Sequence, residues 1–287
     1  MYVPCVLLPV KRIIAIGDLH GDYKATLLAL KKANLIDEHH NWIGDDTIVV
    51  QLGDIVDRGS RLSKYAEMCD EDSELKIMNL MEKLNKQAKL KNGAIYCLLG
   101  NHEVMNVLGD FSYTSKKGLL HFGGKKGRYE YFKSGGKIAQ KMAKTRNVIM
   151  RIGDWIFVHG GVTPNIAKKY KIVEINDLMR RYLNGEKKLE NDKRFRELFL
   201  NQGSILWTRK YSEENVNQKD LDKTLEYLGG KHLVVGHTPQ DKINSRCKGK
   251  IWRIDTGMSD AFGKKKADER IEVLEIINNG EKVSILK

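Results

Sequence analysis

The sequence is poor in the features that mark secreted, disulfide-bonded or membrane-spanning proteins. Its 287 residues include only four cysteines, and none forms a Cys-x-x-Cys pair, which argues against a disulfide framework. No apolar stretch approaches the roughly 18–20 residues that a bilayer span needs. The apolar segment 1–10 lacks a basic region and contains two prolines, so it does not resemble a signal peptide. We therefore expect a cytoplasmic protein without membrane association.

Proline is equally scarce, with four in the chain, and no segment rich in proline, glycine or serine divides the sequence. The length alone allows one large domain or two small ones. Because neither a linker nor an internal repeat is present, we expect a single domain over residues 1–287, with insertions at about 59–92 and 111–150.

Positive charge is in excess, since 50 basic and 37 acidic residues give a net charge of +13. Such a charge is compatible with nucleic acid, anionic membrane or phosphorylated partners. The basic residues are spread along the chain and mixed with acids, with denser patches at 115–128 and 262–270. No arginine-rich tract or aromatic-basic RNA motif is present. A solvated surface is therefore the favoured interpretation, and nucleic acid is not the favoured partner.

Short apolar, β-branched runs predict buried strands, and amphipathic segments between the early ones predict helices. The helices are expected at 22–34, at 73–93 with Ser73 as N-cap and Gly93 just past the end, and at about 217–228. Strands alternating with helices indicate an α/β fold with parallel pairing, and the last strands, which have no helix between them, indicate an antiparallel portion. The strands are expected at 12–17, 47–53, 94–100, 155–160, 232–237, 251–257, 271–277 and 282–286.

Six of these strands end in short motifs that combine glycine with polar side chains. In open α/β sheets, ligands bind beyond the carboxyl ends of the strands. A single such motif is typical of a turn, but six at successive strand ends indicate one shared site. The motifs are Gly-Asp-Leu-His-Gly-Asp at 17–22, Gly-Asp-Ile-Val-Asp-Arg-Gly at 53–59, Gly-Asn-His-Glu at 100–103, His-Gly-Gly at 159–161, Gly-His-Thr at 236–238 and Asp-Thr-Gly at 255–257.

The side chains in these motifs suit divalent metal ions. Asp18 and His20 are two residues apart, so in extended chain both face one ion. Asp54 is a carboxylate that can bridge two ions, and two ions about 3.5–4 Å apart can clamp a phosphate and activate water. Asn101 is predicted to be a ligand, and His102 a proton donor beside the ligands. Carboxylate, imidazole and amide donors favour Mn²⁺, Fe²⁺ or Zn²⁺.

The order of these motifs resembles that of the calcineurin-like metallophosphoesterases. Gly-Asp-Ile-Val-Asp-Arg-Gly together with Gly-Asn-His-Glu is specific to their phosphoprotein phosphatase branch. The segments 100–113, 205–211 and 234–240 are similar to the Shewanella-like protein phosphatases, so the resemblance covers most of the chain. It implies a four-layer fold in which a mixed β-sandwich is flanked by helices.

The resemblance also implies roles for individual residues. His102 would protonate the leaving oxygen and Asp57 would orient it. Arg58 would bind the phosphate oxygens; Arg209 is a second phosphate ligand or a packing residue. The two cations would be held by Asp18, His20 and Asp54, and by Asp54, Asn101, His159 and His237.

The resemblance finally implies a metal-dependent phosphoprotein phosphatase. It would hydrolyse phosphotyrosine, phosphoserine or phosphothreonine by direct attack of a hydroxide that bridges two cations, Mn²⁺ in vitro with iron or zinc as alternatives. A phosphorylated protein or peptide is the expected partner, and the oligomeric state is left open. Two other functions stay open: a dinucleoside polyphosphate or RNA-cap hydrolase on the same scaffold, and a non-enzymatic basic nucleic-acid-binding protein.

Two residues keep two interpretations each, and one segment has an expected position over the site. Asp22 and Tyr113 are either close to the substrate or on the surface. The segment 111–150 lies between two ligand motifs and is rich in glycine, lysine and aromatic residues. It is expected to form a basic wall or lid over the site.

Overall fold

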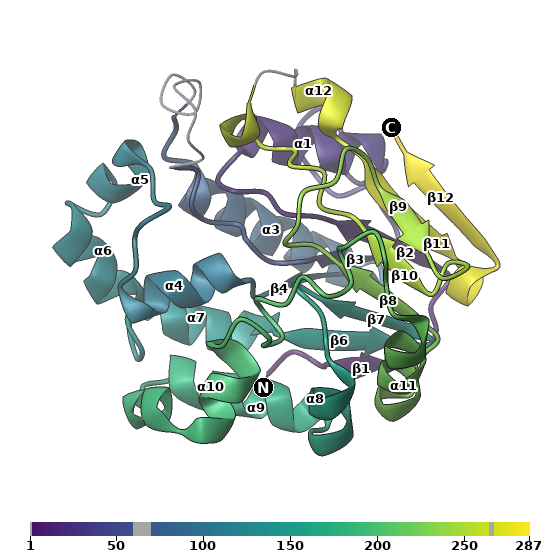
Figure 1. Cartoon of the computed structure of the whole chain (residues 1–287). Helices are drawn as coiled ribbons and strands as arrows, with labels where there is room; N and C mark the ends of the chain where they lie inside the picture. The colour runs from purple at the N-terminus through teal and green to yellow at the C-terminus, as the bar shows by residue number, and fades with distance from the viewer. Residues whose placement is uncertain (1, 60–69, 264–266) are drawn as a thin grey trace.

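In the computed structural model, which describes residues 2–59, 70–263 and 267–287, two six-stranded mixed sheets pack face to face between layers of helices (Figure 1). One sheet has the strand order β12-β11-β2-β3-β4-β5 and the other β1-β6-β7-β8-β10-β9. The predicted four-layer sandwich is confirmed. The strands are β1 (Val6–Leu7), β2 (Arg12–Ile16), β3 (Ile48–Gln51), β4 (Ala94–Leu98), β5 (Arg146–Asn147), β6 (Ile149–Ile152), β7 (Trp155–Val158), β8 (His232–Val235), β9 (Asn244–Arg246), β10 (Ile251–Arg253), β11 (Val273–Ile277) and β12 (Lys282–Leu286).

The helices cover the outer faces of the sandwich. In Figure 1, α1 and α3 lie above the sheets, α8, α9 and α11 lie below them, and α5 and α6 stand to one side. Among the described residues, no helix is both long and apolar enough to cross a membrane. The helices are α1 (Tyr23–Lys32), α3 (Glu74–Lys89), α4 (Asn101–Leu108), α5 (Lys116–Leu120), α6 (Lys125–Phe132), α7 (Lys137–Thr145), α8 (Pro164–Lys169), α9 (Ile172–Leu183), α10 (Lys193–Phe199), α11 (Gln218–Leu228) and α12 (Ala267–Arg270).

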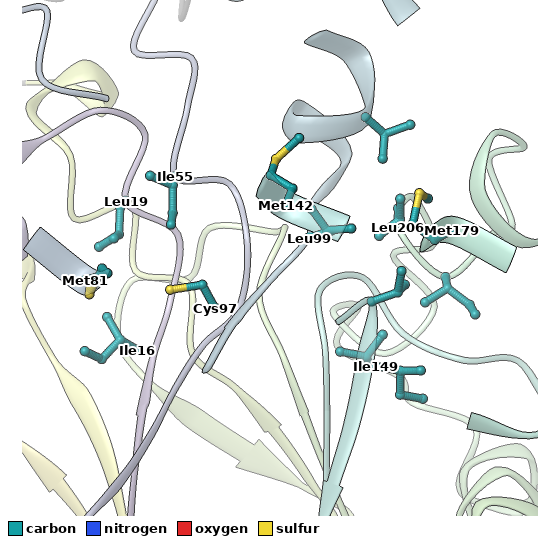
Figure 2. Close-up of a cluster of buried hydrophobic side chains, with 14 of the residues drawn as sticks. Ile16, Leu19, Ile55, Met81, Cys97, Leu99, Met142, Ile149, Met179 and Leu206 are labelled. Carbon is teal, nitrogen blue, oxygen red and sulfur yellow. The ribbon is translucent and has the colours of Figure 1, made fainter. Parts of the chain in front are cut away.

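Alternation along the strands separates the core into two parts. Successive side chains of a strand point to opposite faces, so Ile13 and Ala15 of β2 pack between the sheets while Ile14 and Ile16 pack beneath the helices. Figure 2 shows part of the outer cluster, including Ile16, Met81 and Cys97. The predicted pairing is confirmed as well, because β2, β3 and β4 are parallel neighbours and β11 and β12 are antiparallel.

The predicted N-cap position of Ser73 at the start of helix α3 is confirmed, but the expected capping bond and the predicted end of the helix need correction. Ser73 stands at the N-cap position, but its side chain makes no capping bond, because its backbone is already helical (φ −92°, ψ −2°). The helix ends at Lys89, so Gly93 is not its terminal glycine. Gly93 instead allows close backbone approach: a Cβ there would lie 2.6 Å from the carbonyl oxygen of Asp45.

Candidate active site

The sheet register brings the predicted ligand loops to one edge of the sandwich. Ile16 pairs with Gln51, and Gln51 pairs with Cys97, so the loops that follow β2, β3 and β4 leave the sheet side by side. In the other sheet Val158 pairs with Val235, which places the loops after β7 and β8 next to each other. The structure thereby gathers two groups of potential metal ligands: His20, Asp54 and His102, and Asp54, His159 and His237.

Asp54 lies at the centre and belongs to both groups. Its Oδ2 is 3.2 Å from His159 Nε2 and 3.8 Å from the Nε2 atoms of His20 and His102. Its Oδ1 accepts a hydrogen bond from the backbone N–H of His102 at 3.0 Å. Asp18 completes the centre, since its Oδ2 lies 3.9 Å from His20 Nε2. One carboxylate thus reaches both groups, which is the geometry that a bridging ligand needs.

Each of three imidazoles has one ring nitrogen held by a backbone carbonyl, which leaves the other nitrogen for the centre. Metal-binding histidines are oriented in this way, because the outer hydrogen bond selects the tautomer and the ring position. The amide oxygen of Asn101 lies 2.9 Å from His159 Nε2. The three outer bonds run from His20 Nδ1 to the Val56 oxygen at 3.2 Å, from His159 Nδ1 to the Leu52 oxygen at 2.9 Å, and from His237 Nε2 to the Trp207 oxygen at 3.2 Å.

Asp57 and His102 form a hydrogen-bonded pair at the rim of the centre. His102 Nδ1 is 2.9 Å from Asp57 Oδ2, so Nε2 faces the centre. Asp57 is fully buried and also accepts bonds from Asn106 at 2.9 Å and from Thr114 at 2.8 Å. The ring of Tyr113, which is partly exposed, packs edge-on against the His102 ring at 5.0 Å. The pair thus has the arrangement of an acid catalyst and the carboxylate that orients it.

This geometry agrees with the comparison to known proteins. The family model of the calcineurin-like phosphoesterases matches residues 11–241 of the chain. The chain belongs to the calcineurin-like phosphoesterases. The family assignment made from the sequence motifs is therefore confirmed, and with it the assignment to hydrolases that act on phosphoesters.

Similar proteins point to one branch of the family. The phosphoesterase is 34% identical to Shewanella-like protein phosphatase 2 of Arabidopsis thaliana, over 93% of this chain and 75% of the relative. It is 33% identical to Shewanella-like protein phosphatase 1 of Plasmodium berghei, over 86% of this chain and 67% of the relative. Among solved structures, the cold-active protein-tyrosine phosphatase of a psychrophilic Shewanella species is similar over 100% of this chain and 83% of its own, with a TM-score of 0.81 and 28% identity.

The donor atoms of the phosphoesterase fit divalent metal ions. The side chains that converge offer carboxylate oxygens, imidazole nitrogens and one amide oxygen, and none of them offers a thiolate. This mixture suits ions such as Mn²⁺, Fe²⁺ and Zn²⁺. Two glycines leave room for the carboxylates of this donor set. A Cβ at Gly100 would lie 2.1 Å from Asp54 Oδ1, and one at Gly236 would lie 2.4 Å from Asp18 Oδ1. The residues present therefore fit the metal that the family implies.

Burial and neighbouring charges perturb the titration of these groups. Burial and the nearby carboxylate of Asp255 raise the pKa of Asp18. Burial alone would lower the pKa of His159, but Asp54 and Asp18 outweigh it and raise that pKa to about 10. Burial and the proximity of His159 lower the pKa of His237 to about 3. Such opposed shifts within one small cluster are typical of a functional site.

Several residues of this centre have left-handed backbone conformations. The φ angles of His20, Asp54, Asp57 and His237 are 41°, 52°, 68° and 66°. Residues other than glycine adopt this region uncommonly, and such backbone geometry clusters at active sites, where the surrounding structure holds it in place. The local conformation of these loops is therefore set by the site and not by the preference of each residue.

Glu103 is the main support of this backbone, and no role was predicted for it. Its buried carboxylate accepts hydrogen bonds from the N–H groups of Asp54 at 2.9 Å, Ile55 at 2.8 Å and Gly100 at 2.8 Å. Arg146 lies 3.3 Å from the same carboxylate. The presence of Glu103 in the motif at 100–103 was visible in the sequence, but the three donors come from two loops that only the fold brings together.

Arg128 supports the Asp57–His102 pair and was also missed. It lies in α6, within the segment 111–150, and its side chain is fully buried. It donates to Asn106 Oδ1 at 2.6 Å, to Glu74 Oε2 at 2.7 Å and to Asp57 Oδ1 at 3.3 Å. Burial opposes ionisation of Asp57, but the hydrogen bond from His102 and the charges of His102 and Arg128 outweigh it and lower the pKa of that carboxyl.

The two predicted phosphate-binding arginines lie at the centre in different environments. Arg58 is buried, with its Nη1 2.8 Å from Asp22 and 3.3 Å from Glu71. Asp22 is buried and accepts a capping bond from the N–H of Ala25 in α1, so the surface role left open for it is excluded. Arg209 is exposed and donates to the carbonyl oxygen of His237 at 3.1 Å and to Thr238 Oγ1 at 2.7 Å.

Proposed function

We propose that this chain is a metal-dependent phosphoprotein phosphatase that hydrolyses phosphomonoesters of tyrosine, serine or threonine. The observation that carries the proposal is the pairing of two features at one edge of the sandwich. Imidazoles whose outer nitrogen is hydrogen-bonded to a backbone carbonyl converge on the carboxylate of Asp54. His102 lies beside them, with its Nδ1 hydrogen-bonded to Asp57. The names of the similar proteins, Shewanella-like protein phosphatases and a protein-tyrosine phosphatase, support the substrate class.

The residues around Asp54 would hold two cations, with manganese expected in vitro and iron or zinc as alternatives. When bound, the two cations would neutralise phosphate charge and lower the pKa of a coordinated water. The residues for the first ion are Asp18, His20 and Asp54, and those for the second are Asp54, Asn101, His159 and His237.

The remaining side chains would act directly on the phosphate ester. His102 Nε2 faces the centre and would donate a proton to the leaving oxygen, while the Asp57 carboxylate holds Nδ1 and the ring orientation. The guanidinium of Arg58 would bind equatorial phosphate oxygens, with Asp22 setting its position. Arg209, which is exposed and bonds to the loop that holds His237, would bind further phosphate oxygens.

The test is a substrate panel with Mn²⁺: a phosphotyrosine peptide, a phosphoserine peptide and diadenosine tetraphosphate. We expect turnover of a phosphopeptide, loss of metal-dependent turnover in Asp54→Asn, and a fall in kcat of about 10²–10⁴-fold in His102→Ala. The loss in His102→Ala should be larger for phosphoserine, whose alkoxide leaves less readily than a phenoxide. Preferred hydrolysis of diadenosine tetraphosphate would instead favour the polyphosphate hydrolase, and steeply salt-dependent RNA binding without turnover would favour the nucleic-acid-binding protein.

Metal binding can be checked without an activity assay. Chelator-treated protein should gain thermal stability when Mn²⁺ is added, because an ion that binds only the folded state stabilises it. Asp54→Asn should lose most of this gain. An equal gain in wild type and Asp54→Asn would place the ions elsewhere.

A further inference from the structure

Two adjoining hollows lie beside helices α8 and α11, on the lower side of the molecule in Figure 1. The first hollow has a volume of about 570 Å³ and the second about 470 Å³. Lys168 of α8 and Tyr227 of α11 line both of them, so the two hollows form one groove. Each volume lies within the range of roughly 300–1,000 Å³ that ligand sites have in proteins.

The first hollow begins at the loops that carry the active centre. Thr163, in its wall, belongs to the loop that starts at His159. Lys210, in the same wall, follows Arg209, whose guanidinium donates to the carbonyl oxygen of His237 at 3.1 Å. A polypeptide whose phosphate lies between Arg209 and the metal ligands can therefore continue directly into the groove.

Positive charge predominates along this groove, since six basic and two acidic side chains line it. Two of the lysines are already neutralised by ion pairs. Lys169 pairs with Glu197 at 2.7 Å, and Lys210 pairs with Asp220, which is one of the two acids in the wall. These pairs hold the walls together and leave the remaining lysines to face a partner.

The three lysines that carry the argument are Lys168, Lys171 and Lys223. All three are exposed, and within the described part of the chain their ammonium groups have neither a hydrogen-bond nor an ion-pair partner. Glu174, the second acid of the groove, accepts a hydrogen bond from the backbone N–H of Lys171 at 2.9 Å and pairs with none of the three ammonium groups. A positive surface of this kind is complementary to a negatively charged partner.

Apolar side chains lie among these charges and indicate the class of partner. Tyr227 is 44% exposed, and in the second hollow Val6 is 41% and Val173 is 51% exposed. Exposed tyrosines are enriched where proteins bind other proteins. A concave surface that mixes lysines with apolar side chains suits a polypeptide with carboxylates and an apolar side chain. It suits less well the evenly spaced phosphates of a nucleic acid or the flat surface of a lipid bilayer.

We propose that this basic groove, formed by Lys168, Lys171, Lys223 and Tyr227, docks an acidic segment of the phosphoprotein substrate while the phosphorylated residue lies at the active centre. The inference rests on the proposed phosphatase function, which supplies the substrate. An extended chain advances about 3.3 Å per residue, so acidic residues several positions away from the phosphorylated residue would lie over the lysines. Docking raises the local concentration of the phosphate at the centre, so it lowers KM and leaves kcat unchanged.

The test uses the full chain with Mn²⁺ and a set of phosphotyrosine peptides. Each peptide carries a block of three glutamates or of three glutamines, placed at increasing distance from the phosphotyrosine on either side. We expect a placement at which glutamate raises kcat/KM about tenfold over glutamine, through KM, because three exposed ion pairs act together. A glutamate-to-glutamine ratio close to one at every placement would overturn the proposal.

Two triple variants then assign the preference to the groove. In the groove variant the ratio should approach one, while kcat for the glutamine peptide stays unchanged; it combines Lys168→Gln, Lys171→Gln and Lys223→Gln. The control variant removes three exposed lysines at the end of α3, on the opposite side of the sheets (Figure 1), and should keep the wild-type ratio; it combines Lys86→Gln, Lys89→Gln and Lys91→Gln. Equal ratios in the two variants would show that net charge and not the groove sets the preference.

Charge reversal gives a sharper result than removal of charge. When Lys168, Lys171 and Lys223 are all replaced by glutamate, a peptide with a lysine block should become the preferred substrate. Tyr227→Ser should raise KM for the glutamate peptide without changing kcat, because it removes the apolar contact and leaves the lysines in place. A continued preference for glutamate after charge reversal would overturn the proposal.

A binding measurement separates this inference from the phosphatase proposal. Fluorescence anisotropy of the unphosphorylated glutamate peptide, with Mn²⁺ present, should show weaker binding to the groove variant than to wild type and the control variant. If no phosphopeptide is hydrolysed but this difference stands, the phosphatase proposal fails and the docking groove remains. If phosphopeptides are hydrolysed and the groove variant matches wild type in both measurements, only the docking groove fails.

Two competing partners are included in the same assay, namely oligouridylate and vesicles that contain phosphatidylserine. We expect the groove variant and wild type to bind each of them equally. Tighter binding of either one than of the glutamate peptide, lost in the groove variant, would overturn the assignment of the groove to an acidic polypeptide.

Discussion

Replacing Arg128 with methionine should destabilise the protein by about 3–5 kcal/mol, the usual cost of removing one partner from a buried ion pair. The guanidinium is fully buried and bonds Glu74 at 2.7 Å, Asn106 at 2.6 Å and Asp57 at 3.3 Å. Methionine fills similar space but leaves two buried carboxylates without their cation. Burial already raises the pKa of Glu74, so Glu74 can take up a proton in the variant. The loss is therefore expected near the lower end of that range.

Urea unfolding at 25 °C measures the effect. Arg181→Met is the matched control, because Arg181 pairs with Glu186 at the surface and its removal should leave the midpoint nearly unchanged. Adding Glu74→Gln to Arg128→Met should recover part of the stability, since it removes one of the stranded charges. Turnover should fall in both variants that lack Arg128 and stay unchanged in Arg181→Met, because Asp57 and His102 lose a buried support only where Arg128 is removed. If Arg128→Met unfolds at the same urea concentration as Arg181→Met, the buried-charge reasoning is wrong.

Three further predictions concern the backbone of the site and the core. Glu103→Gln should cost about 1–3 kcal/mol and weaken Mn²⁺ binding, measured by urea unfolding and metal titration, because only a carboxylate has acceptors for all three N–H groups. Gly100→Ala should lower turnover about tenfold or more, because the added Cβ would displace the carboxylate of Asp54. Gly203→Ala is the control, since a Cβ at Gly203 meets nothing within 4 Å. Equal activity of the two variants would contradict the prediction. Burial raises the pKa of Cys97 to about 11, so in the native protein this thiol should resist iodoacetamide at pH 8 and react only after unfolding, as followed by mass spectrometry of the peptide that contains it. Alkylation of Cys97 at the rate of a free thiol would contradict its burial.

Short apolar runs predicted the strands well, because a buried strand needs continuous β-branched side chains. All eight expected strands are present, usually one or two residues shorter than expected. Strands β1, β5, β6 and β9 were missed, since segments of two to four residues carry little periodicity. The motif at 100–103 was interpreted as ligand chemistry at the end of a strand, yet Asn101 is the first residue of helix α4. The first residues of α4 are polar, as in a ligand loop, so the sequence of this segment does not show a clear helical pattern.

The segment 111–150 shows the limit of composition as a guide. Its lysines and glycines suggested a basic wall over the site, and that interpretation stays a prediction. The structure forms α5, α6 and α7 within the segment and turns Arg128 and Phe132 inward. An arginine in a basic stretch cannot be recognised as buried from its neighbours in sequence, because its partners Asp57 and Glu74 are 71 and 54 residues away.

The order of the motifs was enough to predict the family, the layered α/β fold and the convergence of polar side chains at one sheet edge. These features follow from local chemistry: apolar runs must be buried, and parallel strands carry their ends to the same edge. Tertiary structure alone decided which oxygen of Asp54 faces the imidazoles, which carbonyls hold the rings, and why Glu103 and Arg128 support the site. Each of these depends on atoms that are distant in the chain and adjacent only after the two sheets have packed.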